Sequence, residues 1–305
     1  MTARIPSRRR RRSAMDTSRM FYLFISPWLI GFICFTAGPM LYSLYAAFSK
    51  WNGVSAPNFT GLKNIQTMLF QDSLFWKSVG NTFFYALVTV PLNMVVALFL
   101  AQLLNRRMPL SNFFRSIFYL PSVVAGVAVY IVWSQLYNPF TGIFNDLLSL
   151  VGIQGPGWLI DEHWAMPSLI IMNIFTCGGQ MLILLAGLQD ISDEYYEAAA
   201  LDGASSRQVY FKITLPLLTP VIFFNLIMGI INSLQIFAQP QIMTEGGPMY
   251  ATYVYGLHIY KTAFVYMDFG YACTLAWGLF VLILLLSLFI FRSSKFWVHY
   301  REEVD

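Results

Sequence analysis

The stretch YYEAAALDGASSRQVYFKITLP, residues 195–216, decides how the rest of the chain is interpreted. It is the only long segment that is polar and patterned like a docking surface, and long charge-free apolar runs lie before and after it. Ser192, followed by two acidic residues, is placed to cap a helix that runs through Leu201. Gly203 then supplies the left-handed residue that ends this helix.

A second short helix is predicted directly after this glycine. Ser205 and Gln208 have the spacing of a capping box. The helix is expected to end near Leu215, because Pro216 disfavours helical geometry in the residue before it. Two short helices joined by a glycine turn would protrude between two membrane spans, with alanines that let another protein approach closely. An ordinary helical loop is the alternative that the spacing alone leaves open.

The composition is that of an integral membrane protein. Of 305 residues, 57% are hydrophobic and only 11% are charged, whereas soluble domains carry about 25% charged residues. Cys34, Cys177 and Cys273 lie within apolar runs, and their spacing suits neither a disulfide framework nor a metal site. We therefore expect no metal, no set of catalytic residues and no enzymatic activity.

Six stretches contain no Asp, Glu, Lys or Arg, and each exceeds the roughly 20 residues that a helix needs to cross a bilayer. A charge at the centre of a span costs roughly 2.5–3.5 kcal/mol on insertion scales, so six uninterrupted runs predict an all-α membrane protein. The runs cover residues 20–49, 78–105, 116–145, 163–189, 213–244 and 269–291. The six transmembrane helices are expected near residues 21–48, 80–104, 115–137, 164–188, 217–241 and 269–291.

The basic residues predict that both termini are cytoplasmic. Residues 1–18 are expected to form a basic, disordered cytoplasmic tail ahead of a transmembrane domain over residues 19–300. Segments assigned to the inside hold most of the Lys and Arg, as the positive-inside rule requires. The net charge of +4 does not indicate nucleic acid as a partner, because the cations sit in the tail and in short loops beside apolar runs.

The loop over residues 189–216 resembles the EAA loop of the inner-membrane permease subunits of ABC importers. That pattern is Glu-Ala-Ala, three residues, Gly, nine residues, Ile, one residue and Leu-Pro. The matching residues are Glu197, Ala198, Ala199, Gly203, Ile213, Leu215 and Pro216. Similarity to the first-permease type of the sugar-importer branch extends over YLFISPWLIGF at 22–32, GLKNI at 61–65, FRSIFYLPSVVAGVA at 114–128, AGLQDIS at 186–192 and MTEGGP at 243–248.

This resemblance implies a type I ABC importer permease fold in a bacterial or archaeal cell (inner) membrane. It implies that Glu197, Ala198, Ala199, Asp202 and Gly203 form a coupling helix that docks on an ATPase dimer. The further partners that it implies are a second homologous permease, an extracytoplasmic sugar-binding protein and membrane lipid. ATP and Mg would bind to the ATPase, and this chain would bind no cofactor.

The absence of ionisable residues from the spans indicates, independently of the resemblance, that another protein supplies the energy for transport. The chain has no GxxxxGK[ST] phosphate-binding loop. The spans also lack the carboxylates, bases and histidines that ion-coupled transporters use inside the membrane. A channel or facilitator that works without an ATPase is the main alternative.

The same absence of charge predicts a neutral substrate, such as a sugar or oligosaccharide. Polar residues in a membrane usually face a bundle interior or a wet cavity, although hydrogen bonding between helices is the simpler explanation. Aromatic rings such as those of Tyr130 and Trp133 would suit the apolar faces of a sugar. Another neutral solute is a second possibility, and amino acid, phosphate or polyamine importers fit less well. The candidate residues are Asn225, Gly229, Asn232, Ile236 and Gln239 on one helical face, Ser233 and Gln235 beside it, and Asn173, Thr176, Gly179 and Gln180 in the preceding span.

Overall fold

The computed structural model describes residues 14–106 and 109–299, and almost all of its regular structure is helical. Among these described residues, four helical stretches are long and apolar enough to cross a membrane, and two bent helix pairs raise the number to six if each pair is one span. The prediction of an all-α membrane protein is confirmed. The four stretches are Met20–Ala47, Ser73–Asn105, Ser206–Leu234 and Phe269–Ser294.

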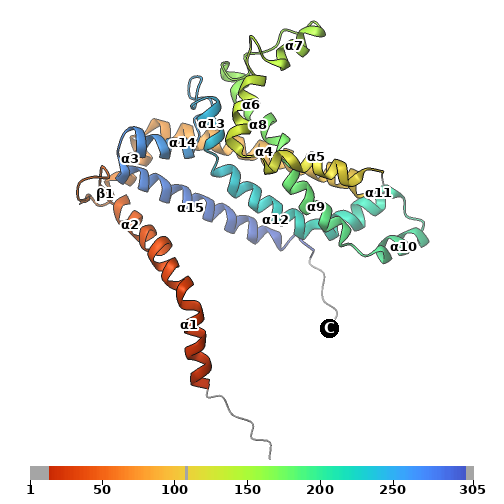
Figure 1. Cartoon of the computed structure of the whole chain (residues 1–305), viewed down its shortest axis with the longest axis horizontal. Coiled ribbons are helices and arrows are strands. Elements are labelled where there is room, and N and C mark those ends of the chain that lie inside the picture. The colour runs from red at the N-terminus through yellow and green to blue at the C-terminus, as the bar shows by residue number, and fades with distance from the viewer. Residues whose placement is uncertain (1–13, 107–108, 300–305) are drawn as a thin grey trace, which may run out of the picture.

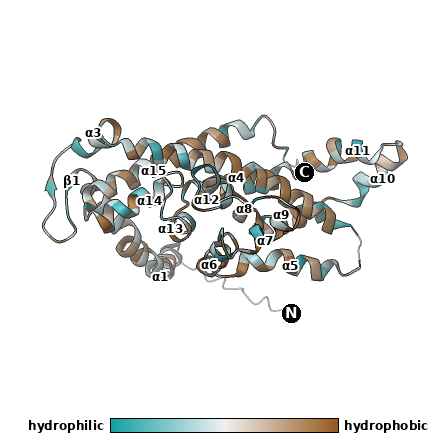
Figure 2. Cartoon of the chain, turned by 90° about the horizontal axis from the view of Figure 1, so that it is seen from above, coloured by the Kyte–Doolittle hydropathy of each residue, from teal (hydrophilic) through white to brown (hydrophobic). Residues whose placement is uncertain are grey.

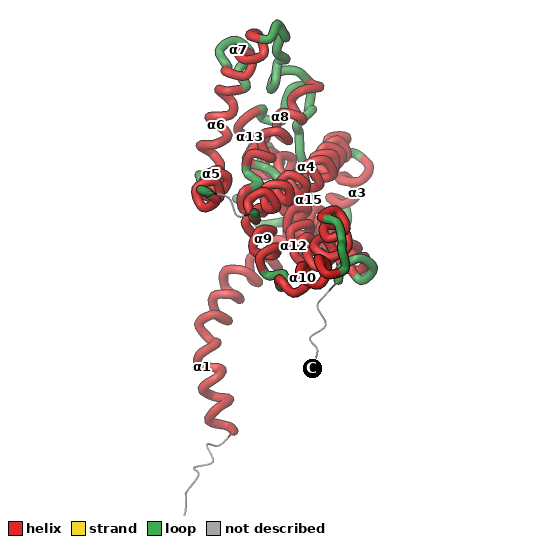
Figure 3. The backbone as a smooth tube through the Cα atoms, turned by 90° about the vertical axis from the view of Figure 1, so that its right-hand side faces the viewer, coloured by secondary structure: helices red, strands yellow, loops and turns green. Residues whose placement is uncertain are grey.

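The first span diverges from the body of the molecule (Figures 1 and 3). Its most apolar window has no buried residue within this chain. Residues 1–13 of the predicted tail lie outside the described residues, whereas residues 14–18, which were expected to be disordered, begin the first helix. The span consists of α1 (Ala14–Phe32), the π-helical turn η1 (Ile33–Ala37) and α2 (Gly38–Ala47).

The body of the molecule is organised around a long helix with small residues at its packing face. Ala97 and Ala101 are fully buried against Met181 and Leu184, because small side chains let two helix backbones approach closely. Hydrophobic residues cover most of the long helices (Figure 2). These helices are α4 (Ser73–Asn105), α9 (Gly178–Gln189), α12 (Leu215–Leu234) and α15 (Phe269–Ser294).

Two of the predicted spans are bent rather than continuous. The span expected near 115–137 is divided into α5 (Ser111–Val123) and α6 (Gly126–Leu136), which meet at 96°. Its two linking residues adopt extended backbone angles, with ψ of 140° and 123°. The span expected near 164–188 is divided into α8 (Glu162–Phe175) and α9, which meet at 45°. Charge-free sequence marks where a span lies but carries no signal for these bends.

The close contact between α5 and α9 depends on a single glycine. A Cβ atom at Gly178 would lie 2.1 Å from the backbone oxygen of Phe118 and 2.8 Å from the Cα atom of Tyr119. Neither of those atoms is the flexible end of a side chain, so the two helices must separate to admit any side chain. Gly179, the next residue, has no atom within 4 Å of an added Cβ.

We expect Gly178→Ala to lower the melting temperature of the purified chain markedly, and Gly179→Ala to have little effect. Overpacking of this kind costs about 1–3 kcal/mol, and here the clash is with backbone. Thermal unfolding of the two variants in the same detergent measures the difference. Equal melting temperatures would show that α5 and α9 do not pack as described.

The fifth span also ends earlier than expected. The sequence predicted a span near 217–241, but α12 ends at Leu234 and a separate helix follows. Continuing the helix would place Pro240 where it lacks an N–H to donate and clashes with the preceding turn. Other short elements are β1 (Ser49–Lys50), β2 (Asn58–Phe59), α3 (Lys63–Phe70), α7 (Ile143–Leu150), α13 (Ala238–Met243), α14 (Tyr255–Tyr260) and the π-helical turn η3 (Lys261–Val265), with β1 and β2 antiparallel.

A polar cluster joins α14 to the ends of α4 and α15. Asp72 caps α4 by accepting from the backbone N–H of Phe75, and it also accepts from the hydroxyl of Tyr271 at 2.6 Å. His258 Nε2 lies 2.8 Å from the same carboxylate, and its Nδ1 lies 3.1 Å from the hydroxyl of Tyr253. Each ring nitrogen has one partner, so a neutral imidazole satisfies every group in the cluster.

This cluster predicts that acid destabilises the fold. Burial lowers the pKa of His258 from its usual 6.5, although Asp72 opposes the shift. Folding therefore disfavours protonation of His258. The stability that the neutral imidazole contributes is fully present above pH 6.5, and it is lost as the pH falls from there through the lowered pKa. Burial alone raises the pKa of Asp72, but the hydrogen bond from the Tyr271 hydroxyl and the interactions with His258 and the Phe75 N–H outweigh it, so the pKa is lowered from 3.8. The stability that this carboxylate contributes is therefore present above its usual pKa and is lost only as the pH falls through the lowered value, in a more acid range than for His258.

We expect the melting temperature to be flat above about pH 7 and to fall below pH 6.5. His258→Gln should lower the plateau and remove the step, because no imidazole remains to be protonated. His163→Gln is the matched control, since its side chain is 90% exposed. The interpretation fails if the His258 variant keeps the step of the unmodified chain.

Candidate substrate cavity

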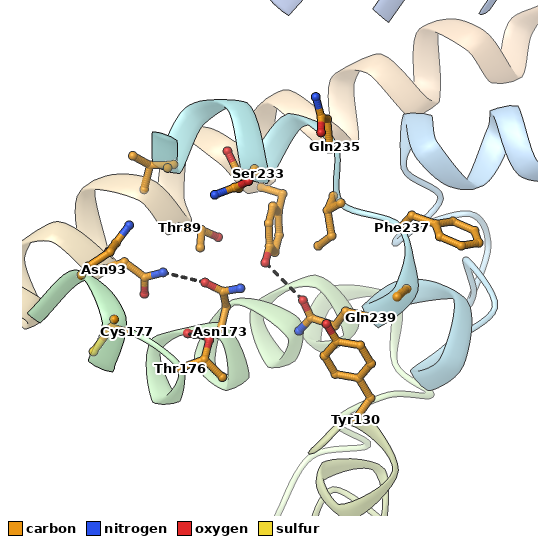
Figure 4. A pocket seen from close by; sticks show the side chains of 18 residues that line it. Thr89, Asn93, Tyr130, Asn173, Thr176, Cys177, Ser233, Gln235, Phe237 and Gln239 are labelled. Atoms are coloured by element: carbon orange, nitrogen blue, oxygen red, sulfur yellow. Dashed lines mark hydrogen bonds between the residues drawn. The ribbon is translucent and has the colours of Figure 1, made fainter. Parts of the chain in front are cut away.

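A cavity of about 570 Å³ is lined by residues of α4, α6, α8, α9, α12 and α13 and of the turns beside them (Figure 4). Its described lining is rich in amides and hydroxyls and includes no Asp, Glu, Lys, Arg or His. The lining residues are Tyr85, Thr89, Val90, Asn93, Tyr130, Asn173, Thr176, Cys177, Gly179, Gln180, Gly229, Asn232, Ser233, Gln235, Ile236, Phe237, Ala238 and Gln239.

Most of the residues that the sequence singled out meet in this cavity. Asn225 does not line it: this residue is 2% exposed, and its amide donates to the carbonyl of Val221 at 2.9 Å. Trp133 packs in an aromatic cluster with Tyr137 and Phe144 instead. The singled-out residues that do line the cavity are Asn173, Thr176, Gly179, Gln180, Gly229, Asn232, Ser233, Gln235, Ile236 and Gln239.

The sequence reasoning missed the wall that α4 provides. Tyr85, Thr89 and Asn93 recur every four residues and therefore lie on one face of the helix. In the fourth and fifth spans, candidate residues were chosen because polar residues share one helical face. The same search in the second span would have found these three residues. No pattern in the sequence indicates Val90, Cys177, Phe237 or Ala238.

Part of the polar lining holds the helices together. The Asn93 amide donates to Asn173 Oδ1 at 2.6 Å, and the Tyr85 hydroxyl donates to Gln239 Oε1 at 3.2 Å (Figure 4). Gln239 Nε2 donates to the carbonyl of Leu169 at 2.8 Å, and the residue is only 3% exposed. Polar residues in the spans either face a wet cavity or form hydrogen bonds between helices, and Gln239 mainly does the latter.

Other polar atoms at the cavity have no partner in the described chain. Thr89 Oγ1, Asn93 Oδ1 and Gln180 Oε1 are buried and make no hydrogen bond with described residues. A buried acceptor without a partner costs about 1–3 kcal/mol, so native proteins seldom leave one unsatisfied. All three residues line the same cavity. Each of these oxygens is covered by protein atoms, so a hydroxyl donor in the cavity would satisfy it once a neighbouring side chain shifts.

The loop over 189–216 forms at the opposite end of the body from β1 and α3 (Figure 1). α10 (Asp193–Leu201) starts at Ser192, whose side chain accepts from the N–H of Glu194. It ends at Gly203, which has φ of +71°, and the Gly203 and Ala204 N–H groups close the helix on the carbonyls of the last turn. These caps were predicted, and the structure confirms them.

The second helix begins as predicted but does not end as predicted. α11 (Ser206–Val209) starts with the expected Ser205–Gln208 capping box. It then continues through the π-helical turn η2 (Tyr210–Thr214) directly into α12, so the expected end near Leu215 is wrong. In η2 the N–H of Leu215 bonds to the carbonyl of Tyr210, five residues back. This longer repeat accommodates Pro216 without breaking the helix.

The described loop presents a groove of about 580 Å³ between α10 and the α11–η2 segment. The hydroxyls of Tyr196 and Thr214 lie 3.3 Å apart and tie α10 to η2. Among the predicted coupling residues, Ala198, Ala199 and Asp202 line the groove, Glu197 and Gly203 are exposed beside it, and Leu215 and Pro216 lie at the start of α12.

The chain is similar to known transport proteins over nearly its whole length. Residues 93–295 match the family described as binding-protein-dependent transport system inner membrane component. The chain is 42% identical to the probable ABC transporter permease protein YesP of Bacillus subtilis, with 93% of each chain covered. It is 34% identical to the lactose transport system permease protein LacF of Rhizobium radiobacter, covering 90% of this chain and 93% of that one.

A solved structure shares the fold. This structure is a bacterial alginate ABC transporter in complex with an alginate pentasaccharide-bound periplasmic protein. The matched chain superposes with a TM-score of 0.81 at 24% identity, covering 92% of this chain and 96% of that one. These relatives are transport components rather than enzymes, in agreement with the expectation that this chain is not an enzyme.

Proposed function

Because this chain belongs to the family of inner membrane components of binding-protein-dependent transport systems, we propose that it forms one half of an import path for a neutral sugar or oligosaccharide. A second, homologous permease forms the other half. An ATPase dimer that binds ATP and Mg drives the cycle from the cytoplasmic side, and an extracytoplasmic binding protein delivers the substrate. Both termini of this chain face the cytoplasm.

The cavity carries the assignment of the substrate class. Its described lining combines amides and hydroxyls with the rings of Tyr85, Tyr130 and Phe237, and it offers no charge to an ionic substrate. Sugars present many hydroxyl donors, which match the unpartnered oxygens of Thr89, Asn93 and Gln180. The similarity to a lactose permease supports the same class.

The continuous helix from the loop to the cavity supports the coupling role. Residues 206–234 form one helical stretch, and its far end brings Gly229, Asn232 and Ser233 to the cavity. A displacement of α10 by a docked ATPase therefore reaches the cavity wall through one rigid element. ATP binding then selects one of two states of the path, because the closed ATPase dimer favours only one of them.

The exposed first span supports the presence of a second permease subunit beside this chain. The most apolar window of this span has no buried residue within this chain, so its apolar side chains are left uncovered, although α2 at the end of the span contacts α15. A homologous subunit beside it supplies the missing surface. The groove between α10 and α11 would hold a surface of the ATPase, with Glu197, Ala198 and Gly203 in contact and the Leu215–Pro216 pair positioning the helix behind them.

Uptake by the reconstituted complex tests the proposal. The two permeases and the ATPase are placed in liposomes with the binding protein outside and ATP inside, and labelled neutral saccharides are supplied. Uptake should require ATP and every subunit. Liposomes that contain this chain alone should take up no sugar, and ATP-independent uptake by them would favour the facilitator. Stimulation of ATP hydrolysis only by charged solutes would contradict the substrate class.

A further inference from the structure

An apolar crevice lies where the end of the first span meets α3 and the last span, at the β1 end of the molecule (Figure 1). Its volume is about 520 Å³, and residues of α2, α3 and α15 form most of its walls. Met68 and Phe75 in its lining are buried, whereas Val281 and Leu285 are 48% and 62% exposed. The crevice therefore opens on the apolar surface of α15, a helix long enough to cross the membrane.

Every polar side chain that lines this crevice has a partner within the fold. The indole N–H of Trp277 and the hydroxyls of Tyr255 and Thr274 donate to oxygens of α2 and α15 at 2.7–3.2 Å. None of the buried, unpaired side-chain atoms of the described chain belongs to this lining, in contrast to the main cavity. Water needs polar partners to occupy a buried site, so the crevice suits hydrocarbon rather than water or a sugar.

Two lysines flank the β1 end of the crevice. The side-chain amide of Asn64 donates to the carbonyl of Ser49 at 3.0 Å, which brings their sequence neighbours Lys63 and Lys50 to the same end. Both lysines are exposed, and neither forms a hydrogen bond or an ion pair within the described residues. Asp268 is also at this end, where it caps α15 by accepting from a backbone N–H. The two ammonium groups therefore remain available to an anion.

The start of α3 also favours an anion at this place. Within the described chain no side chain caps this helix, and its first turn holds no acidic residue, so the positive end of its dipole is uncompensated. Lys63 stands at its first position, where a cation is unfavourable without a counter-charge. A phosphate group would compensate both. Ile65, two residues further on, lines the crevice, so the anion would lie at its mouth.

We propose that the crevice holds an acyl chain of an anionic phospholipid, whose phosphate binds at Lys50, Lys63 and the start of α3. The lipid comes from the outer leaflet, given the proposed cytoplasmic termini. The exposed indole of Trp76 donates to the carbonyl of Leu69, a lining residue, at 3.1 Å, and tryptophan is enriched at membrane interfaces. The acyl chain supplies contacts that the crevice walls otherwise lack, and it thereby fastens the first span to α15.

Photo-cross-linking locates the lipid in the assembled complex. Liposomes contain phosphatidylglycerol or phosphatidylcholine with a diazirine in an acyl chain, and mass spectrometry maps the labelled peptides of this chain. Phosphatidylglycerol should label the crevice walls several-fold more than it labels the rest of α15. Leu285→Trp should fill the mouth and lower this labelling several-fold. Leu288→Trp is the matched control, because Leu288 is 56% exposed on the same helix but does not line the crevice.

The headgroup is tested with the same two lipids. The double variant Lys50→Gln with Lys63→Gln should abolish the several-fold preference for phosphatidylglycerol. Lys295→Gln should keep it, because Lys295 is exposed at the opposite end of α15. Equal labelling by both lipids in the unmodified complex would refute the anionic headgroup.

Two further outcomes would overturn the site itself. Uniform labelling of all lipid-facing helices would mean that only bulk lipid surrounds the chain. A crevice that no lipid labels in the complex, but that lipid labels in this chain alone, would mean that the second permease occupies it. Neither measurement involves transport, so failure of the proposed import would leave both results valid.

Discussion

Replacing Gly203 with proline should abolish ATP-driven uptake and co-purification of the ATPase, while the chain still accumulates in the membrane. Gly203 has φ of +71°, whereas a proline ring fixes φ near −65°. The N–H of Gly203 bonds to the carbonyl of Ala200 at 3.1 Å, and proline has no N–H to replace it. The end of α10 must therefore unwind, and the alanine-lined groove beside it loses its shape.

The chain offers a matched control for this substitution. Gly152 follows α7 with φ of +75°, its N–H bonds to the carbonyl of Ser149 at 3.0 Å, and a Cβ there meets nothing within 4 Å. Gly203 likewise has no atom within 4 Å of an added Cβ. Gly152→Pro therefore damages a helix end in the same way but far from the loop. We expect it to leave ATPase co-purification intact.

These two variants separate coupling from general damage. Membrane content is measured by immunoblot, and assembly by the amount of ATPase retained on the purified permease. Retention of the ATPase and normal sugar-stimulated hydrolysis in Gly203→Pro would refute the coupling role of the loop. Loss of ATPase in both variants would mean that damage to any helix end affects assembly. The specific role of the loop in docking the ATPase would then be unsupported.

The sequence predicts well those features that depend on neighbouring residues. The caps at Ser192 and Ser205 follow from side chains two or three positions from the N–H groups that they bind, and the helix end at Gly203 follows from the left-handed backbone that glycine allows. Six charge-free runs locate the apolar helices, because a charge near the centre of the membrane is costly. These signals are local, so no knowledge of the fold is needed to interpret them.

Features that depend on contacts between distant segments could not be predicted. The bend between α8 and α9 comes beside Gly178, whose missing side chain matters only because α5 crosses there. The Asp72–His258–Tyr271 cluster joins residues 186 and 199 positions apart. A polar stripe likewise cannot reveal which amides bond to other helices and which remain unpartnered, as Gln239 and Gln180 show.

Because Gln239 is bonded to another helix in the described chain and Gln180 is not, substitutions at these two positions should have opposite effects. Gln180→Met should reduce sugar-stimulated ATP hydrolysis roughly tenfold, the equivalent of one hydrogen bond of about 1.4 kcal/mol, and should leave the melting temperature unchanged or higher. Gln180 Oε1 is buried without a partner in the described chain. Its removal therefore breaks no bond within the fold, and methionine fills a similar volume.

Gln239→Met should show the opposite pattern. Its amide bonds to the carbonyl of Leu169, and its oxygen accepts from Tyr85, so methionine removes both bonds, leaves the buried Tyr85 hydroxyl without this acceptor and lowers the melting temperature. Both glutamines line the same cavity, which makes the two variants controls for each other. If Gln180→Met instead destabilised the fold without changing hydrolysis per folded complex, Gln180 would be a structural residue. The unpartnered oxygens would then lose their value as a guide to the substrate path.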